Sequence, residues 1–505
     1  MSSEVLALPK PAARTVLISR ESVALAALCL LALGLRWLGI TNESLWLDEA
    51  TSLSLARLPL VELVTHLLKE DVHPPLYFAM LHFWIAGGDG VAYLRLLSVL
   101  TGVLTLPAVY LLGRQLFDAR VGLIAAALLA ISPLHIYYSQ MVRNYVLFVL
   151  LVVLAFYTLL RAMQTDRWLW WCLYIVSAIA SLYSHYYSVL TLFIQNVIAL
   201  AFARRAGSGR PWRHWLVAST AVGAVFGVWL LNSAMLTEGV APGWLSAASA
   251  PSVASLPSTV AQFTLGETAG QYARWARLGS YFFFTLMLVA ASVERAPGGR
   301  RFRFRRQAGV WMSWAYFLIP LIAIWLVSQV KPMYALRYLM PFMVPYYLLL
   351  AAGVVALDRR WPRWLAFGLS LAFIAPGVWY TYQTPQEHDW RIVSTYVLER
   401  AQPGDVVVFN PPWYSKPFDY YAAGRVEIFQ PTDALDTQQA CDEAPAEHRR
   451  LWLIQPYDRH WSDPDNALYS CLAARYDQVD VSRFPPQEGG VYLFALNRSA
   501  HRDWT

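Results

Sequence analysis

Two adjacent carboxylates, Asp48 and Glu49, follow the first long apolar run of this 505-residue chain. Neighbouring side chains on a helix point in different directions, so one carboxylate can face a cavity while the other serves the structure. A carboxylate that is partly desolvated at a membrane boundary has a raised pKa and is a better general base. The two acids could instead belong to a helix cap that begins at Asn42 or Ser44. Local chemistry leaves the general base and the cap equally open.

A second pattern is His73-Pro74-Pro75, which comes about 25 residues after the acidic pair. The two prolines fix two φ angles and favour an extended residue before them, which places His73 at the rigid start of a helix. The N-terminal dipole of that helix favours anions, so a phosphate could bind there. Many helices begin after prolines, and the pattern alone is a weak signal.

A third group surrounds Arg143, with Tyr138, Gln140 and Tyr145 close to it in the sequence. An arginine at the outer end of a membrane span must either extend its side chain to the interface or bind an anion. Snorkelling and an aromatic belt explain any single case. Several such cations on a side that is otherwise poor in charge favour a bound lipid phosphate, and we expect four of them there: Arg95, Arg143, Lys331 and Arg337.

The elements that position these residues are expected to be membrane helices. Apolar residues make up 57% of the chain and charged residues 14%, against roughly a quarter charged in soluble domains. This composition excludes a disordered chain, a collagen and a disulfide-stapled miniprotein, and predicts a mainly α-helical polytopic membrane protein. About eleven spans are expected, at 22–41, 92–112, 121–138, 142–160, 168–184, 186–203, 214–232, 278–293, 309–328, 335–357 and 364–381.

Charge asymmetry predicts the orientation of these spans. With a cytoplasmic N-terminus, 20 lysine and arginine residues fall in inside segments and 8 in outside connections, as the positive-inside rule requires. The basic segment 300–306, with Phe302 and Phe304 among its arginines, could suggest nucleic-acid binding. A topology signal or an anionic-lipid contact is favoured instead, so we expect no nucleic-acid partner. We expect a multi-pass protein of the inner (plasma) membrane.

Two outer connections, 42–91 and 233–277, are long enough to carry function, and residues 53–69 show a rough helical period. We expect a transmembrane domain over 1–384 and an extracytoplasmic α/β domain over 385–505, with helices at 390–400 and 466–476 and strands at 405–410, 450–455 and 490–497. Cys441 and Cys471 are its only cysteines, and an oxidising location favours a disulfide between them over two buried thiols. The domain also has four clustered aromatics, which could bind sugar but are expected to form its core: Trp413, Tyr414, Tyr420 and Tyr421.

Together these motifs resemble the lipid-linked-sugar glycosyltransferases of the GT-C fold, and most closely their protein-mannosyltransferase-like and aminoarabinose-transferase-like branch. The resemblance covers most of residues 20–160 and extends weakly to 337–339. It rests on four motifs in the right order: Trp46–Ala50, His73–Phe78, Arg95–Ser98 and Ser132–Tyr145.

The resemblance implies an inverting transfer of sugar from a polyprenyl-phosphate donor to a protein, lipid or cell-envelope glycan acceptor. Asp48 would be the catalytic base and Glu49 its neighbour. His73 stands where the aminoarabinose transferases have lysine, which leaves the charge of that phosphate contact open. Donor phosphate contacts are expected from His73, Arg95, Arg143, Lys331 and Arg337, and other substrate contacts from Tyr77, Tyr138, Gln140, Tyr145, Tyr338 and His185.

The chemistry needs no obligatory cofactor. A divalent cation, Mg²⁺ or Mn²⁺, could gather at the acidic pair with Glu70, Asp71 and His73, as in oligosaccharyl-transferase relatives. The mannosyltransferase-like members are regarded as metal-independent, and we therefore favour no metal. A transporter or flippase of lipid-linked sugars is the alternative, but the symmetric halves with broken helices that it would show are not evident. A non-enzymatic scaffold would be indifferent to the loss of Asp48.

Overall fold

The computed structural model describes residues 19–69, 73–206, 209–236, 250–267, 270, 272–295, 302–305, 307–383, 389–431, 437–443, 450–455, 463, 465–484 and 489–496. The chain divides into two compact units. The first comprises Met1–Ile40 with Leu58–Gln383, and the second comprises Thr41–Arg57 with Thr384–Thr505. The acidic pair therefore belongs to the second unit, together with the C-terminal α/β region.

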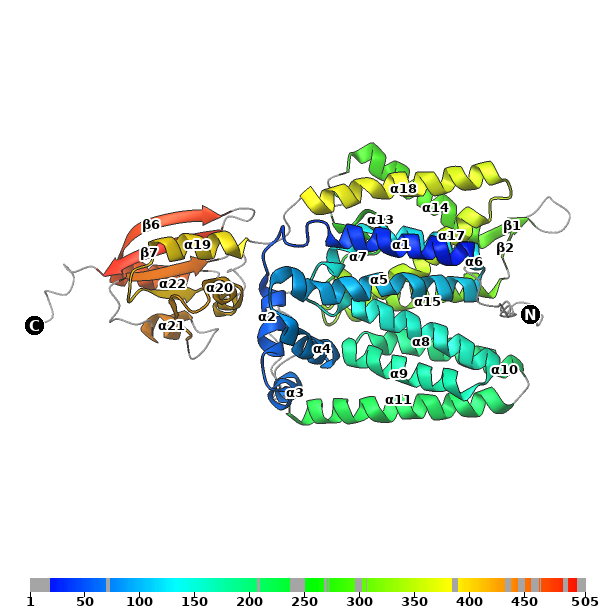
Figure 1. The fold of residues 1–505 in the computed structure, drawn as a ribbon, viewed down its shortest axis with the longest axis horizontal. Helices are drawn as coiled ribbons and strands as arrows, with labels where there is room; N and C mark the ends of the chain where they lie inside the picture. The colour runs from blue at the N-terminus through cyan, green and yellow to red at the C-terminus, as the bar shows by residue number, and fades with distance from the viewer. Residues whose placement is uncertain are drawn as a thin grey trace, which may run out of the picture. The chain divides into compact units, whose positions relative to one another are not determined.

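The first unit is a bundle of apolar helices, and every segment expected to be a span is helical in it (Figure 1). Among the described residues, seven helices are long and apolar enough to cross a membrane, and the bent pair α6–α7 would make an eighth. The chain is thus a multi-pass membrane protein, while the count of eleven spans stays a prediction. Apart from that bent pair, the helices at the expected spans are α1 (Arg20–Trp37), α5 (Val91–Leu116), α8 (Tyr145–Thr165), α9 (Trp168–Ser184), α10 (Ser188–Ala206), α11 (Gly209–Leu236), α14 (Arg274–Ser292), α15 (Ala308–Val327), α17 (Met343–Val355) and α18 (Arg360–Gln383).

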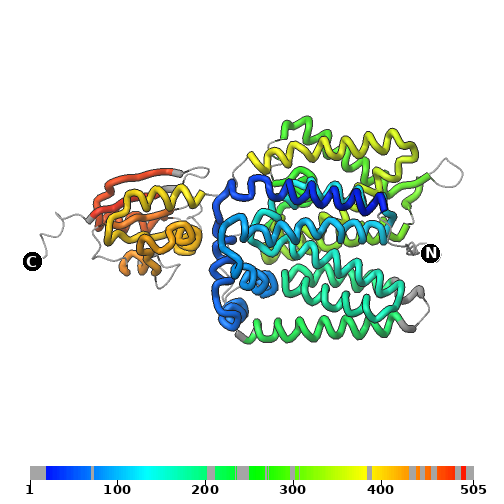
Figure 2. Tube along the Cα trace, viewed as in Figure 1, coloured from blue at the N-terminus to red at the C-terminus, as the bar shows by residue number. Residues whose placement is uncertain are grey.

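Burial separates central from peripheral helices. In the most apolar stretch of α8, 78% of the length is buried, whereas the buried share is 22% in α11 and in α18. The large apolar side chains of α11 and α18 are exposed on the bundle surface, as expected for contact with lipid. The α5 and α6 (Ala119–Ala130) helices approach closely through glycines, since a Cβ atom on Gly113 would lie 2.7 Å from the Cα of Gly122. In the tube trace, α8, α9 and α11 run alongside one another (Figure 2).

Short helices occupy the two long connections expected on the outer side. The first contains α2 (Leu47–Ala56), α3 (Leu60–Lys69) and α4 (Leu76–Trp84), and the second contains α13 (Ser255–Leu265). The helical period expected over 53–69 is real but interrupted, because Pro59 has no N–H to continue a helix and suits a helix start.

A buried arginine organises the break between α6 and α7 (Pro133–Ser139). Arg36 of α1 is fully buried, and its guanidinium donates to the carbonyls of Leu129 and Ala130 at the end of α6. It also donates to His135 Nδ1 at 2.7 Å and Ser139 Oγ at 3.1 Å in α7. Arg36 thereby adds side-chain donors to carbonyls at the C-terminal end of α6, where helix-internal partners run out, inside an apolar bundle.

We therefore expect Arg36→Met to destabilise the protein by roughly 2–4 kcal/mol, because several buried acceptors lose their donor at once. The measurement is the midpoint of thermal unfolding of the purified protein in detergent. Arg20→Met, at the exposed opposite end of the same helix, is the matched control. Equal midpoints for the two variants would show that the Arg36 network contributes nothing to stability.

The second unit contains a five-stranded mixed sheet in the order β4-β3-β5-β7-β6. The β3 strand (Val406–Phe409) runs parallel to β4 (Glu427–Ile428) and β5 (Arg450–Gln455), and β7 (Gly489–Leu496) runs antiparallel to β5 and β6 (Tyr476–Phe484). Alternate residues of β3 enter two cores, as expected for a strand buried on both faces. The helices are α19 (Trp390–Arg400), α20 (Ser415–Ala422), α21 (Thr437–Glu443) and α22 (Ala467–Arg475).

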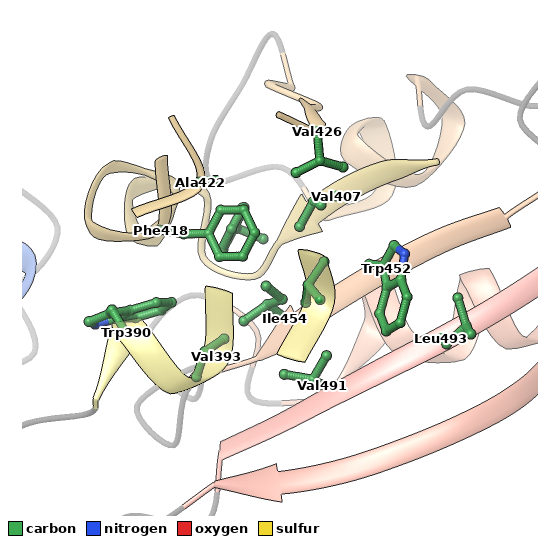
Figure 3. Close-up of a cluster of buried hydrophobic side chains, with 12 residues drawn as sticks. Trp390, Val393, Val407, Phe418, Ala422, Val426, Trp452, Ile454, Val491 and Leu493 are labelled. Carbon is green, nitrogen blue, oxygen red and sulfur yellow. The ribbon is translucent and has the colours of Figure 1, made fainter. Parts of the chain in front are cut away.

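One core packs α19 and α20 against the sheet around Phe418 and Trp452 (Figure 3). The other packs α21 and α22 on the opposite face around Leu453 and Leu472. A disulfide joins Cys441 of α21 to Cys471 of α22, with their Cα atoms 6.3 Å apart. The five expected elements of this region are present; β4, β6, α20 and α21 were not predicted, nor was the hairpin of β1 (Val293–Arg295) and β2 (Phe302–Phe304) in the first unit.

Hydrogen bonds attach the segment that carries α2 to the α/β region. Ser44 Oγ accepts from the backbone N–H of Trp390 at 2.9 Å, and the Leu45 N–H donates to the Tyr421 hydroxyl at 2.8 Å. Arg391 donates to the carbonyls of Thr41 and Asn42. Together with the packing of α2 on α20, these contacts explain why Thr41–Arg57 belongs to the second unit although it is remote in sequence.

Candidate functional site

The two carboxylates of the acidic pair have different surroundings. Glu49 is fully buried, and its carboxylate accepts from the backbone N–H of Trp46 at 3.4 Å at the start of α2. Ser44, one of the two residues considered as the cap, instead binds Trp390. Asp48 is half-buried in the same first turn. The cap therefore accounts for Glu49, and Asp48 is the carboxylate that remains accessible.

His73 and Arg143 lie together in the first unit. Arg143 is 5% exposed, and its Nη2 lies 3.1 Å from His73 Nε2. Because a guanidinium only donates hydrogen bonds, His73 Nε2 accepts and the imidazole is neutral in this arrangement. Arg143 then supplies the positive charge of the pair. The role of His73 in phosphate binding stays a prediction.

His185, in the short connection between α9 and α10, lies against the same pair. Its ring centroid is 6.4 Å from that of His73 and 4.9 Å from that of Tyr338, and it stacks on Phe148 at 4.7 Å. His185 Nδ1 accepts from the Tyr187 N–H at 3.1 Å, which places the proton of the neutral ring on Nε2. No partner for this buried Nε2 exists among the described residues. It is a donor available to an anion.

Burial is the main cause that lowers the pKa of His185 well below its usual value, and the nearby Arg143 and Arg337 guanidinium groups add to it. Below about pH 6.5 the His185 imidazole is protonated in the unfolded chain but stays neutral in the folded protein. The free energy of unfolding therefore falls as the pH drops through that value. We expect His185→Gln to flatten the dependence of the thermal midpoint on pH between about pH 7 and 5. Parallel pH profiles for wild type and variant would contradict this assignment.

Tyrosines surround the cluster. The Tyr77 hydroxyl of α4 lies 3.0 Å from Ser98 Oγ of α5, and Ser98 in turn donates to the Arg143 carbonyl at 3.3 Å. The Arg143 guanidinium lies over the ring of Tyr145, with its Cζ atom 5.5 Å from the ring centroid. Ring contacts connect Tyr145 with Tyr138 at 5.1 Å and with Tyr338 at 6.3 Å. Residues from four separate sequence regions thus form one basic and aromatic cluster: His73, Tyr77, Tyr138, Arg143, Tyr145, His185, Arg337 and Tyr338.

For three residues expected in the site, the described contacts or positions do not join them to this cluster. Arg95 donates to the Ile40 carbonyl at 2.7 Å, just beyond α1. Gln140 donates to the carbonyls of Arg36 and Leu38, so it satisfies the end of the same helix. Lys331 is exposed in the turn after α15, and within the described part of the chain no hydrogen bond or ion pair joins it to the cluster. Their roles in substrate binding stay predictions.

Sequence reasoning missed Glu267, which accepts a hydrogen bond from the Tyr138 hydroxyl. Desolvation raises the pKa of this carboxyl, against the hydrogen bond from Tyr138 and the charge of Arg337; the residue as a whole is solvent-accessible. Glu267 is one of only two acidic residues in the connection 233–277. That rarity was the one sequence feature that could have marked it as a candidate site residue. Tyr187 was also missed, and it packs on Tyr338 at 5.3 Å.

No group of three histidine, cysteine or acidic side chains that could hold a metal occurs among the described residues. Glu70 and Asp71, two members of the metal set considered from the sequence, lie outside those residues. The preference for a metal-independent reaction therefore stays a prediction.

Comparisons with known proteins agree with this architecture. A family model described as dolichyl-phosphate-mannose-protein mannosyltransferase matches residues 72–231. A search of the curated proteins finds no match. Among solved structures, ArnT from Cupriavidus metallidurans bound to undecaprenyl phosphate is 11% identical with a TM-score of 0.61, and the match covers 93% of this chain and 97% of that one.

Two structures of an oligosaccharyltransferase from Archaeoglobus fulgidus are similar as well. The complex with zinc and sulfate is 15% identical with a TM-score of 0.55, covering 94% of this chain and 73% of that one. The complex with an inhibitory peptide and a dolichol-phosphate is 14% identical with a TM-score of 0.50, covering 95% and 74%. At these identities the likeness concerns the fold. The resemblance inferred from the four motifs is confirmed at that level: the chain has the GT-C fold.

Proposed function

We propose that this protein transfers a sugar from a polyprenyl-phosphate donor to an acceptor at the outer face of the membrane. The observation that carries the proposal is the buried cluster around Arg143, His73 and His185, which offers a guanidinium and an imidazole N–H to an anion within a membrane bundle. Two of the similar structures were solved with undecaprenyl phosphate and with a dolichol-phosphate. A lipid phosphate is the anion that such a position would meet.

The reaction follows from the leaving group. The acceptor oxygen or nitrogen attacks the anomeric carbon, the bond from that carbon to the phosphate oxygen breaks, and its electron pair stays on the lipid phosphate. A phosphate leaves from a low-pKa oxygen, so no general acid is needed, in contrast to glycoside hydrolysis. The charge that develops there needs arginine and other donors, which Arg143, His185 and Arg337 would supply.

Asp48 would take the proton from the acceptor in this scheme. Glu49 is committed to the backbone of Trp46, which leaves Asp48 as the carboxylate of the pair for this role. Direct displacement by the acceptor inverts the anomeric centre. A hexose or pentose donor and a protein, lipid or cell-envelope glycan acceptor all fit the scheme.

We further propose that the protein lies in the plasma (inner) membrane with a cytoplasmic N-terminus and an extracytoplasmic C-terminal unit. The excess of basic residues in the expected inside segments supports this orientation. The Cys441–Cys471 disulfide supports it independently, because disulfides persist in oxidising compartments.

The test is to incubate the purified full chain with a panel of polyprenyl-phosphate sugars and candidate acceptors, and to follow loss of the sugar from the lipid by mass spectrometry. Conversion of at least one donor to free lipid phosphate and a glycosylated product supports the proposal. A chain that moves the intact donor across vesicle membranes but never cleaves it would be a flippase.

For the metal, we expect transfer to continue at an unchanged rate in excess EDTA. Charge stabilisation by the Arg143 cluster makes a bound cation unnecessary in this scheme. The measurement is the initial rate with and without EDTA, followed by addition of Mg²⁺ or Mn²⁺. Activity that vanishes in EDTA and returns with either ion would overturn the expectation.

A further inference from the structure

A separate pocket of about 550 Å³ lies within the second unit, between α2 and the α20 region. Its wall on the α2 side includes Ser54 and Arg57, and its opposite wall includes side chains of both charges, an amide and two aromatic rings. The volume falls in the range of small-molecule sites. The aromatic, charged and amide residues of that second wall are Trp413, Lys416, Asp419, Tyr420 and Gln430.

The pocket divides the four clustered aromatics of this unit into two pairs. Tyr414 stacks on Trp390 with centroids 5.5 Å apart, and the Tyr421 hydroxyl accepts from the backbone of the α2 segment. These two serve the structure, as expected for a core. Trp413 and Tyr420 instead line the pocket, although all four rings are half-buried. The α/β core is complete without them.

We propose that this pocket binds a saccharide unit of a glycan acceptor. Aromatic rings give the flat apolar surface on which a sugar ring can lie, while Lys416, Asp419 and Gln430 provide the donors and acceptors that hydroxyl groups need. A lipid tail would remove the charged and amide groups of this lining from water and offer them no hydrogen bonds in return. The carboxylate of Asp419 lines the pocket together with Arg57 and Lys416, so the lining offers both acceptors and donors, which hydroxyl groups use together. Mixed polarity around aromatic rings fits an uncharged polyhydroxyl ligand best.

The position of the pocket on α2 indicates which sugar unit it holds. Residues advance by about 100° on a helix, so Ala50, Leu53, Ser54 and Arg57 share one face and Asp48 lies on the other. The two faces are separated by the width of a helix, roughly 10 Å. The pocket would therefore hold a unit neighbouring the one that Asp48 activates, and the acceptor would be an oligosaccharide. Only this last step rests on the proposed function.

The test is a glycan array probed with the fluorescently labelled full chain in a detergent without a sugar headgroup, with peptides printed as comparison spots. No lipid-linked donor is present, so binding is measured independently of transfer. We expect retention on one or more oligosaccharide classes. Trp413→Ala and the conservative Asp419→Asn should each lower that signal at least tenfold, while Tyr396→Ala, a half-buried aromatic of the same unit outside the pocket, should leave it unchanged.

Retention on peptides alone, no retention on saccharides, or equal signals for wild type and Asp419→Asn would overturn the proposal. Asp419 is exposed, so its amide variant keeps the inference testable if Trp413→Ala fails to fold. Asp48→Asn should still bind the array. Array binding by a wild-type protein that transfers sugar from no donor would refute the proposed function and leave the saccharide site standing.

Discussion

Replacing Asp48 with asparagine is expected to reduce sugar transfer by about a thousandfold, within the range that a positioned general base contributes. Asparagine keeps the size and the hydrogen-bonding shape of the side chain but cannot accept the acceptor's proton. Binding of undecaprenyl phosphate should survive, because the residues proposed to hold the phosphate belong to the other unit of the chain. The measurements are initial transfer rates and titration of the lipid phosphate by native mass spectrometry.

Glu62→Gln is the matched control, because it neutralises an exposed carboxylate on the neighbouring helix α3. It should transfer sugar at the wild-type rate. Glu49→Gln tests the division of roles within the pair: a weaker capping bond to Trp46 should lower the thermal midpoint, and the rate should fall less than for Asp48→Asn. Wild-type turnover by Asp48→Asn would remove Asp48 from the mechanism.

The helices of the first unit could be predicted because hydrocarbon imposes a minimum apolar length, which is visible in any sequence. Their breaks were harder to predict. Residues 121–138 looked like one span, but the structure bends there by 61° between α6 and α7. Ser132 caps the second helix by accepting from the His135 N–H, and Pro133 occupies its first position. Those residue types were readable as a helix start, but nothing in the sequence indicated that the distant Arg36 donates to carbonyls at the break.

The site shows the same limit. Residue types pointed to arginines on the outer side, but type alone does not distinguish Arg143, which contacts His73, from Arg95, which binds the Ile40 carbonyl. Both are buried cations near the ends of helices. Glu267 joined the cluster through Tyr138, 129 residues earlier in the chain. Pairings over such separations depend on how the helices pack, and a single sequence carries no record of that packing.

Arg143→Met is expected to lower kcat by about 10²–10³-fold, the cost typical of removing one donor that stabilises developing charge. Methionine preserves much of the apolar stem, so the loss is mainly that of the guanidinium. Arg143→Lys should recover part of the rate, since an ammonium supplies the charge without the forked geometry. His73→Gln should cost less than Arg143→Met, because His73 accepts from Arg143 and is neutral in this arrangement. Rates are measured with saturating donor.

Arg274→Met, which removes an exposed arginine at the start of α14, is the matched control and should leave kcat unchanged. Since Arg143 is buried, thermal midpoints must be compared at the same time. A variant with a wild-type midpoint and a depressed kcat places the guanidinium in the reaction. If Arg143→Met instead loses stability and keeps its kcat, the arginine only supports the packing of His73 and Tyr145, and the phosphate must be bound elsewhere. A larger loss in His73→Gln than in Arg143→Met would reverse the assignment of charge within the pair.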